Sequence, residues 1–471
     1  MIDVEWFDKK DIYSIHKKSL ELIEEVGFKL DDSDLLKKLK GFDTKIDLSN
    51  RSIRISKKVS EYFLTKIPKK IKLYGIDPKY DIELGKQKYY RPISGTINII
   101  KDYINIRKPT KQDVKNVAKV VQNLDFIHFN ATAVHPFDVP NDVMDIAAAK
   151  ISFENCSKHI LVDTLNKNSF EAVLEIAFKI AGSEKQFRLR PFFQVHFPAV
   201  SPFIFDKNAC SNLKLATEYR IPIRIASSPM SGGNSPIKLA GTLLLMHTEI
   251  IAGAIIAQML NEGCPVYCGA APTIFNMKFG TMSWGSAEHA KMAACSARLA
   301  HYCNMFSSTT GFATDSKMPD QQSVIEKSMN VLLAALSGVD ILAGAGLFEG
   351  ELTYDIVQLV IDNEIAKYVE NILRGIEINE ENMSNDLIKE IGIGGNYLAT
   401  EQTLNLFKTE HESSELFDRR SRGTWNNIEE KSMYEKAKKI ADDIISNKNE
   451  YVLPDKVIGE IEEVYLKYSK N

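Results

Sequence analysis

The sequence predicts an α/β protein built on a (β/α)8 barrel (a TIM barrel), with an N-terminal α/β cap and a C-terminal helical extension. First, eight short apolar or β-branched runs alternate with stretches of helical periodicity. Second, the chain has neither a GxGxxG after a strand nor a GxxxxGK[ST], the fingerprints that would support the alternative, an open doubly wound sheet. Third, 471 residues, 44% of them apolar, suffice for one large barrel with attachments.

The barrel strands are expected in eight runs. They are residues 95–100, 126–131, 159–164, 192–197, 221–228, 265–270, 305–311 and 339–346. Helices should separate most of them. Thr110 can cap one helix with Asp113 three residues on, and Ser235-Pro236 should begin another, with proline at the first helical position.

The N-terminal cap is expected to contain two helices and a short strand. Apolar residues recur at helical spacing over 11–26, and Gly27 follows as a C-cap. A strand over 52–55 and a helix over 57–65 come next. The expected domains are the cap over 1–91, the catalytic barrel over 92–400 and a charged helical region over 401–471 that packs on the barrel.

Charge and cysteine content indicate a cytoplasmic protein without nucleic-acid or membrane partners. Lys plus Arg (59) nearly balances Asp plus Glu (62), so the net charge is −3. Six cysteines without a CxxC are typical of a reduced compartment and are expected as small buried hydrophobes rather than zinc ligands. The acidic and polar N-terminus is not a signal peptide. The apolar stretch 239–260 contains His247, Glu249 and Gln258, which predicts a buried core helix rather than a membrane span.

Candidate site residues follow from the rule that barrel chemistry lies at the carboxyl ends of the strands. Gln194 and His196 lie in the fourth expected strand. The loop SSPMSGGNSP contains Gly232, Gly233 and Asn234, and the helix expected from Pro236 could aim free amides at a carboxylate or phosphate; a plain βα turn is the alternative.

Two further carboxylates and a lysine admit two interpretations each. Glu249, deep in an apolar helix, either anchors neighbouring loop amides or reaches into the site. Asp315 and Lys317, after the seventh strand, are either acid–base or Schiff-base groups or ordinary surface residues. His135, His159 and His196 lie on separate strand ends, so no metal site is expected from them.

Aromatic residues are frequent in the loops that follow the strands. Core packing explains most of them, but aromatic faces with few positive side chains nearby also suit a bound cation. The candidates for such a cage are Trp284, Phe312, Phe348 and Tyr354.

Several motifs resemble the trimethylamine methyltransferase superfamily over most of the chain. They lie at residues 15–30, 107–114, 228–269, 310–322 and 391–404. The central block is the most specific, because it matches the family pattern of a Gly-rich turn, P-x-x-L-A-G, A-E-x-x-A-G and Q-x-x-x-x-G-x-P. The matching residues are Pro236, Leu239 to Gly241, Glu249, Ala252-Gly253, Gln258, Gly263 and Pro265, with Thr248 in place of the usual alanine.

The resemblance implies a corrinoid-dependent methyltransferase of anaerobic methylamine metabolism on a (β/α)8 barrel. It would move a methyl group from a methylated amine to Co(I) of a corrinoid (cobalamin) carried by a separate protein. No pyrrolysine is printed among the 471 residues, which points to the non-pyrrolysine branch. The expected substrate is therefore a quaternary amine such as glycine betaine, proline betaine, carnitine or γ-butyrobetaine.

Within that expectation each candidate has a role. The four aromatic residues would form the cage, Gln194 and His196 the floor, and Gly232, Gly233 and Asn234 would present amides to the substrate carboxylate. Glu349 or Asp315 would face the cation.

The chain is expected to bind no metal itself and to form a homo-oligomer. The alternatives are a Schiff-base lyase or aldolase that uses Lys317, and a non-catalytic betaine-binding or corrinoid-protein-scaffolding subunit.

Overall fold

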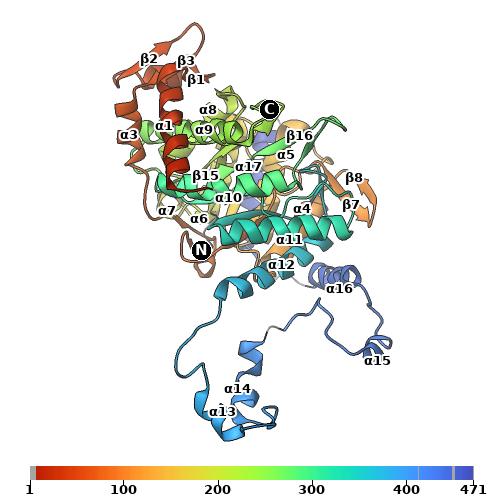
Figure 1. The fold of residues 1–471 in the computed structure, drawn as a ribbon. Coiled ribbons are helices and arrows are strands. Elements are labelled where there is room, and N and C mark those ends of the chain that lie inside the picture. Colours follow the sequence, from red (N-terminus) through yellow and green to blue (C-terminus); the bar gives the residue numbers. More distant parts are fainter. Residues whose placement is uncertain (1–6, 412, 448–450, 470–471) are drawn as a thin grey trace.

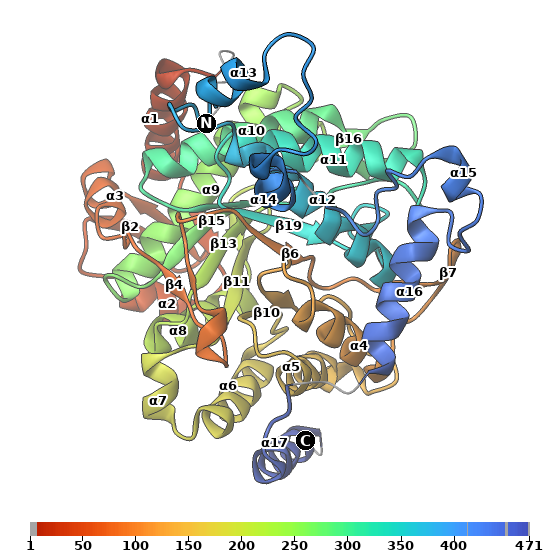
Figure 2. The same cartoon turned by 90° about the horizontal axis from the view of Figure 1, so that it is seen from below.

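The centre of the molecule is a nearly closed barrel of eight parallel strands (Figures 1 and 2). The computed structural model describes residues 7–411, 413–447 and 451–469. The strands are β6 (Tyr89–Pro92), β9 (Asn130–Ala131), β10 (Ile160–Val162), β11 (Phe193–Ala199), β13 (Ile223–Ser227), β15 (Val266–Ala270), β18 (Ser307–Thr309) and β19 (Ile341–Ala345). The sheet order is β6-β19-β18-β15-β13-β11-β10-β9.

The two ends of this sheet meet. His128 N donates to Tyr90 O at 2.9 Å, and beyond the strands Gly95 N donates to Thr132 O at 3.0 Å. These bonds join the segments around β6 and β9, so the predicted (β/α)8 barrel is confirmed.

Seven of the eight expected runs contain a barrel strand, and the first is wrong. The barrel begins with β6, whereas residues 95–100 lead into β7 (Asn98–Asp102), a strand of a separate small sheet at the rim. The first strand therefore starts at Tyr89, before the expected domain boundary at 92. The three domain ranges themselves stay predictions.

Helices surround the barrel. They are α4 (Lys111–Gln122), α5 (Met144–Asn155), α6 (Lys167–Ala181), α7 (Glu184–Leu189), α8 (Lys207–Tyr219), α9 (Leu239–Leu260), α10 (Ala287–Tyr302), α11 (Gln321–Leu336) and α12 (Ile356–Arg374), with the short 3-10 helix η2 (Asn141–Val143) before α5. The cap predicted at α4 is present, because Thr110 N donates to the Asp113 carboxylate at 2.7 Å.

The N-terminal cap has six elements: the two helices and the strand over 52–55 that were expected, and one helix and two strands that were not. They are α1 (Lys9–Glu25), β1 (Phe28–Leu30), α2 (Ser33–Lys38), β2 (Thr44–Asp47), β3 (Ser52–Ile55) and α3 (Lys57–Leu64). Its sheet has the order β12-β1-β3-β2, in which β12 (Ile204–Phe205) comes from the loop after barrel strand β11. The cap is therefore built into the barrel rather than merely attached to it.

A hairpin of β4 (Lys72–Leu73) and β5 (Ile82–Glu83), joined through the 3-10 helix η1 (Pro78–Tyr80), covers the amino ends of the strands. Its apolar side chains share one buried cluster with residues of the barrel wall. The cluster contains Ile71, Leu73, Ile82, Leu84, Tyr89, Phe129, Tyr267 and Ile341. The barrel is thus plugged at its amino end, and a substrate must approach from the carboxyl end.

Short strands build the rim at the carboxyl end. One small sheet contains β8 (Asn105–Arg107), β7, β20 (Leu347–Phe348) and β21 (Thr353–Tyr354), and another contains β14 (Met230–Ser231), β16 (Thr273–Asn276) and β17 (Thr281–Ser283).

After α12 the chain leaves the barrel and forms an arm over residues 375–425 with α13 (Asn385–Ile391), α14 (Glu401–Glu410) and α15 (Arg422–Trp425) (Figure 1). None of these three helices has a buried residue. The chain then returns with α16 (Met433–Ser446), which packs on α4 and α12, and α17 (Asp455–Ser469), which packs on α5 and α6.

Helix α9 is the predicted core helix. It is long and apolar enough to cross a membrane, but 78% of its most apolar window is buried inside the protein. Glu249, fully buried in its middle, accepts hydrogen bonds from Phe203 N (2.9 Å), Ser201 Oγ (2.8 Å) and Ser227 Oγ (2.6 Å). Of the two interpretations of Glu249, the anchor of neighbouring loop groups is therefore confirmed.

Glu249→Ala should lower the free energy of unfolding by about 2–4 kcal/mol, because it leaves three donors without their acceptor beside a buried cavity. Urea unfolding followed by circular dichroism measures the change. Glu380→Gln, on the exposed arm, is the control. An equal and small loss in both variants would contradict the anchoring role.

Candidate functional site

The carboxyl end of the barrel interior holds a group of ionisable side chains, here called the mouth cluster. Its members are Arg91, His135, Asp163, His196, Arg224 and Glu351. The Asp163 carboxylate lies between the two imidazoles, 3.6 Å from His196 Nε2 and 3.9 Å from His135 Nε2. His196 Nε2 is also 3.2 Å from Ser94 Oγ, and its Nδ1 is 3.3 Å from Arg224 Nη1. The cluster is therefore one connected network rather than a set of separate groups.

Strand alternation places these groups inside the barrel. In β11 the side chains of Phe193, Val195 and Phe197 pack in the large core cluster with residues of the surrounding helices. The residues between them, Gln194 and His196, therefore point to the barrel axis. His196 and Arg224 are direct partners in the β11–β13 register, which brings imidazole and guanidinium together.

A glycine makes room for Arg224. A Cβ at Gly269 on β15 would lie 2.6 Å from both Cγ and Nε of Arg224. Because real Cβ atoms do not approach other atoms so closely, the guanidinium can lie against the β15 backbone only while residue 269 is glycine.

Glu351 reaches the cluster from the rim through an unusual turn. Glu349, Gly350 and Glu351 all have positive φ, at 52°, 57° and 75°. Two non-glycine positions of this kind, separated only by Gly350, cost conformational energy, and such strain is found where a side chain must be held in a set direction. Burial raises the pKa of the Glu351 carboxyl to about 7, although Arg224 and Arg91 oppose the shift.

Burial is also the largest effect on the pKa values of Asp163, His196 and Arg91. It raises the pKa of Asp163, against the opposing effect of His135 and Arg91. Burial together with Arg224 and Arg91 holds the pKa of His196 well below its usual value, so this imidazole is neutral at pH 7. Burial lowers the pKa of Arg91 only to about 10, which leaves it charged. Two cations thus face two carboxyl groups whose ionisation is suppressed.

The cluster retains capacity for a ligand. Arg91 Nε and Arg224 Nε are buried and have no hydrogen-bond partner among the described residues. Buried polar atoms are normally paired, so a small polar molecule is the natural complement of this surface. The Asp163 and His196 side chains keep 18% and 19% of their surface accessible, which shows that the network borders open space.

The Gly-rich loop differs from its expected form. Helix α9 begins at Leu239, three residues after Pro236. Gly232 N donates to Ser235 O and Gly233 N to Met230 O, and Asn234 Oδ1 accepts from Met230 N at 2.6 Å. The amides expected to bind a carboxylate are therefore already used within a compact, exposed turn.

The four expected cage residues are all buried. Lys327 Nζ is 5.4 Å from the centre of the Phe348 ring and 6.0 Å from that of Phe312, and it forms a buried ion pair with Asp362 at 2.7 Å. Tyr354 packs in the same core cluster as Phe312. Trp284 packs separately, with Ala271 and Ala313. Two of the four rings, those of Phe312 and Phe348, thus lie near the protein's own ammonium group.

The remaining expected residues lie in rim loops. Asp315 accepts from Trp284 N at 2.7 Å and from Ser283 Oγ, and Glu349 accepts from Thr353 Oγ1. Lys317 is exposed and donates to Asp315 O at 2.6 Å, so it lacks the burial that activates a Schiff-base lysine.

Sequence reasoning missed Arg91, Arg224 and Glu351 as site residues. A charged residue inside an apolar strand, as in Ile-Pro-Ile-Arg-Ile, was a usable signal for Arg224, because alternation places it on the barrel axis. Glu351 carried no such signal, since only the turn geometry distinguishes it from Glu349.

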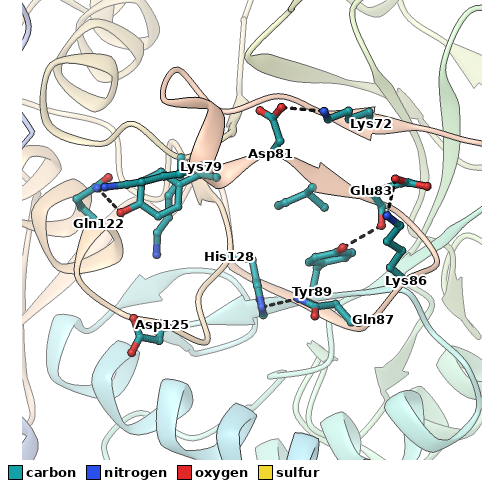
Figure 3. Close-up of a pocket in the computed structure, with 13 residues that line it drawn as sticks. Lys72, Lys79, Asp81, Glu83, Lys86, Gln87, Tyr89, Gln122, Asp125 and His128 are labelled. Carbon is teal, nitrogen blue, oxygen red and sulfur yellow. Dashed lines mark hydrogen bonds and ion pairs between the residues drawn. The ribbon is translucent and has the colours of Figure 1, made fainter.

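A second cavity, of about 500 Å³, lies at the opposite, amino end of the barrel (Figure 3). Its charges are paired within the protein, as in Lys72–Asp81 (2.9 Å) and Lys86–Glu83 (2.9 Å). Lys158 Nζ donates to three backbone carbonyls, those of Val121, Leu124 and Ile127. These groups hold the plugging hairpin in place, and the mouth cluster remains the better candidate site.

Glu351→Gln should stabilise the protein relative to the wild type as the pH rises. A carboxyl whose pKa is raised on folding contributes stability that is fully present below its ordinary pKa of 4.5 and is lost as the pH rises to about 7. The variant lacks this loss, so its advantage should grow by roughly 2–3 kcal/mol between pH 4.5 and pH 7 and then level off. Urea unfolding across this pH range measures it, and a pH-independent difference would contradict the placement of Glu351.

Comparisons with known proteins agree with the resemblance seen in the sequence. The family model described as trimethylamine methyltransferase (MTTB) matches residues 1–470. The trimethylamine methyltransferase MttB of Desulfitobacterium hafniense is 30% identical over 97% of this chain and 92% of its own. A glycine betaine methyltransferase of the same species is 27% identical over 88% of this chain and 87% of its own.

Solved structures show the same fold. The monomethylamine methyltransferase of Methanosarcina barkeri matches 93% of this chain and 88% of its own with a TM-score of 0.53, at 13% identity. The match of the family model to nearly the whole sequence is decisive: the chain belongs to the trimethylamine methyltransferase family and is a methyltransferase.

Proposed function

We propose that this methyltransferase demethylates a quaternary amine that also carries a carboxylate, such as glycine betaine, and passes the methyl group to the corrinoid of a separate protein. The observation that carries this proposal is the pairing, in the mouth cluster, of two guanidinium groups with two carboxyl groups. Similarity to both trimethylamine and glycine betaine methyltransferases leaves the substrate open, and the charges of the site favour a betaine.

A betaine is complementary to these charges. Its carboxylate matches Arg224 and Arg91, whose Nε–H groups lack acceptors. Its permanent cation matches Asp163 and Glu351, and a cation beside them would favour their ionised forms. Trimethylamine has no carboxylate and would leave the charge of the two buried guanidinium groups only partly compensated by Asp163 and Glu351, at a cost in binding free energy.

The proposed methyl transfer needs neither an acid nor a nucleophile from this chain. When the C–N bond of a quaternary amine breaks, its electron pair remains on nitrogen and yields a neutral tertiary amine, so nitrogen needs no proton. The corrinoid of the partner supplies the nucleophile that accepts the methyl group. This chain's residues bind the carboxylate, hold the N-methyl group in a fixed direction and exclude water from it. The neutral His196 and the amide of Gln194 fit the role of floor.

Arg224→Gln should lower kcat/KM for glycine betaine by about 10²-fold, because a charge-assisted pair with the carboxylate is lost. It should change activity on choline, which has the same cation and no carboxylate, far less. Gly269→Ala should act in the same direction by displacing Arg224. Methyl transfer is read from the absorbance change of a reduced corrinoid protein.

Arg188→Gln, which removes an exposed arginine paired with Glu184, is the control and should leave both substrates unaffected. An unchanged ratio of betaine to choline activity in Arg224→Gln would refute the carboxylate-binding role.

The rim of the barrel has the exposed apolar surface that a partner protein requires. It includes Ile97, Phe137, Met277, Phe279 and Leu352, which all lie on segments beyond the carboxyl ends of the strands. Phe279 and Met277 expose 68% and 66% of their surface at the tip of the β16–β17 hairpin. Contiguous exposed apolar residues around a site entrance are typical of protein contacts. We infer that the corrinoid protein docks on this rim.

Replacing both Met277 and Phe279 by Asp should raise the KM for the corrinoid protein by about tenfold or more, because charges enter an apolar contact. Affinity for the amine, measured by calorimetry without the partner, should stay the same. Ile325→Asp, on the exposed flank of α11, is the control. A partner KM equal to that of the wild type would place the docking surface elsewhere.

The other roles expected from the sequence stay proposals. They are cation contacts for Trp284, Phe312, Phe348, Tyr354, Asp315 and Glu349, and carboxylate contacts for Gly232, Gly233 and Asn234. A cytoplasmic location is consistent with six unpaired, buried cysteines.

The expected homo-oligomer is supported by the arm over residues 375–425. Several of its large apolar side chains are exposed, among them Ile376 (91%), Ile378 (78%) and Leu398 (77%), whereas Leu416 packs into the core. We propose that a second copy of the chain covers them, which the mass of the protein in solution tests directly.

A further inference from the structure

Three side chains from distant parts of the sequence meet beneath the N-terminal cap. They are His16 in α1, His247 in α9 and Cys303 at the end of α10. His16 Nδ1 is 3.2 Å from His247 Nε2, and Cys303 Sγ is 3.4 Å from His16 Nδ1 and 3.9 Å from His247 Nε2. None of the three takes part in the mouth cluster.

These separations match the edges of a tetrahedral zinc site. With Zn–N bonds of about 2.05 Å and a Zn–S bond of about 2.3 Å, tetrahedral angles place two nitrogens about 3.3 Å apart and nitrogen and sulfur about 3.6 Å apart. The observed N···N distance of 3.2 Å is close to the first value. The N···S distances of 3.4 and 3.9 Å lie on either side of the second. All three donor atoms could therefore contact one ion without a change of backbone.

The surroundings provide an entry path and a fourth position. A cavity of about 130 Å³ opens to the surface beside His16 and Cys303 and is lined also by Glu61, Thr65, Tyr302 and Asn304. His247 and Cys303 are buried, whereas His16 is half-buried beside this cavity. A water molecule can thus reach the ion on the open side.

We propose that His16, His247 and Cys303 bind one zinc ion that fastens the N-terminal cap to the barrel, with water as the fourth ligand. Binding releases the Cys303 thiol proton to solvent, and the two imidazoles bind through their unprotonated nitrogens. The oxidation state of zinc does not change, so no other reactant is required.

The position of the site points to a structural role. Cys303 precedes β18, so it lies toward the amino end of the barrel, whereas the reacting groups lie at the carboxyl end. The ion would link α1 of the cap to α9 and α10 of the barrel wall, three helices that already pack on one another. This inference is independent of the proposed substrate, and it differs from the expectation that the chain binds no metal and that Cys303 is only a small buried hydrophobe.

The test uses the full chain, purified with chelator and without the corrinoid protein, and titrated with Zn²⁺ and with Co²⁺. We expect one ion per chain, and for Co²⁺ a near-ultraviolet thiolate-to-metal charge-transfer band with visible bands of tetrahedral intensity. Zn²⁺ should also raise the melting temperature. Cys303→Ser and His16→Gln should each weaken zinc binding by about 10²-fold or more and remove the thermal shift.

Cys210→Ser, a buried cysteine of α8 outside the group, is the matched control and should keep both the stoichiometry and the cobalt spectrum. Wild-type protein that binds Co²⁺ without a thiolate band, or binds no ion in a 1:1 ratio, overturns the proposal. So does a Cys303→Ser variant that folds and binds zinc as tightly as the wild type.

Discussion

The burial of two guanidinium groups inside the barrel is the constraint on which the rest of the site depends. Arg91 and Arg224 expose 1% and 6% of their surface, and a buried cation is tolerated only when other groups compensate its charge. Asp163 and Glu351 do so, yet burial raises the pKa of both, so the compensation is incomplete. The site is consequently built to be completed by an anion, and a zwitterion that brings its own cation satisfies the carboxyl groups as well.

The architecture leaves one route by which a ligand can reach the buried guanidinium groups. The β4–β5 hairpin plugs the amino end with apolar side chains, while α9 anchors the β11–β12 loop through Glu249. The strands therefore open only toward the rim, where apolar residues are exposed. Under the proposed function, a small substrate and a large methyl acceptor share this one entrance, which accounts for an apolar rim above a charged floor.

The sequence predicted the barrel well because alternation of buried strands and helices is a long-range repetitive signal. It failed at the first strand, since Tyr-Tyr-Arg-Pro contains a proline and a charge, whereas the β-branched run that follows resembles a strand better and forms the rim. Of the expected site residues, His196 belongs to the mouth cluster, and Gln194 lies two residues before it on the same inward face of β11. Arg91, Arg224 and Glu351 required coordinates, because their meeting depends on register, on Gly269 and on a turn of three left-handed residues.

The aromatic loops show why a cation site cannot be inferred from ring content alone. Phe312 and Phe348 face a cation, as their composition suggested, but it is the ammonium of Lys327, fully buried and paired with Asp362. Asp362 also accepts from Gly346 N and Gln358 Nε2, so this pair is held firmly where α11 and α12 meet the end of β19. A substrate cation at these rings would have to displace a satisfied internal ion pair, whereas the carboxyl groups of the mouth cluster gain by receiving one. Under the proposed function, the quaternary nitrogen is therefore expected beside Asp163 and Glu351, on grounds of charge rather than of the number of nearby rings.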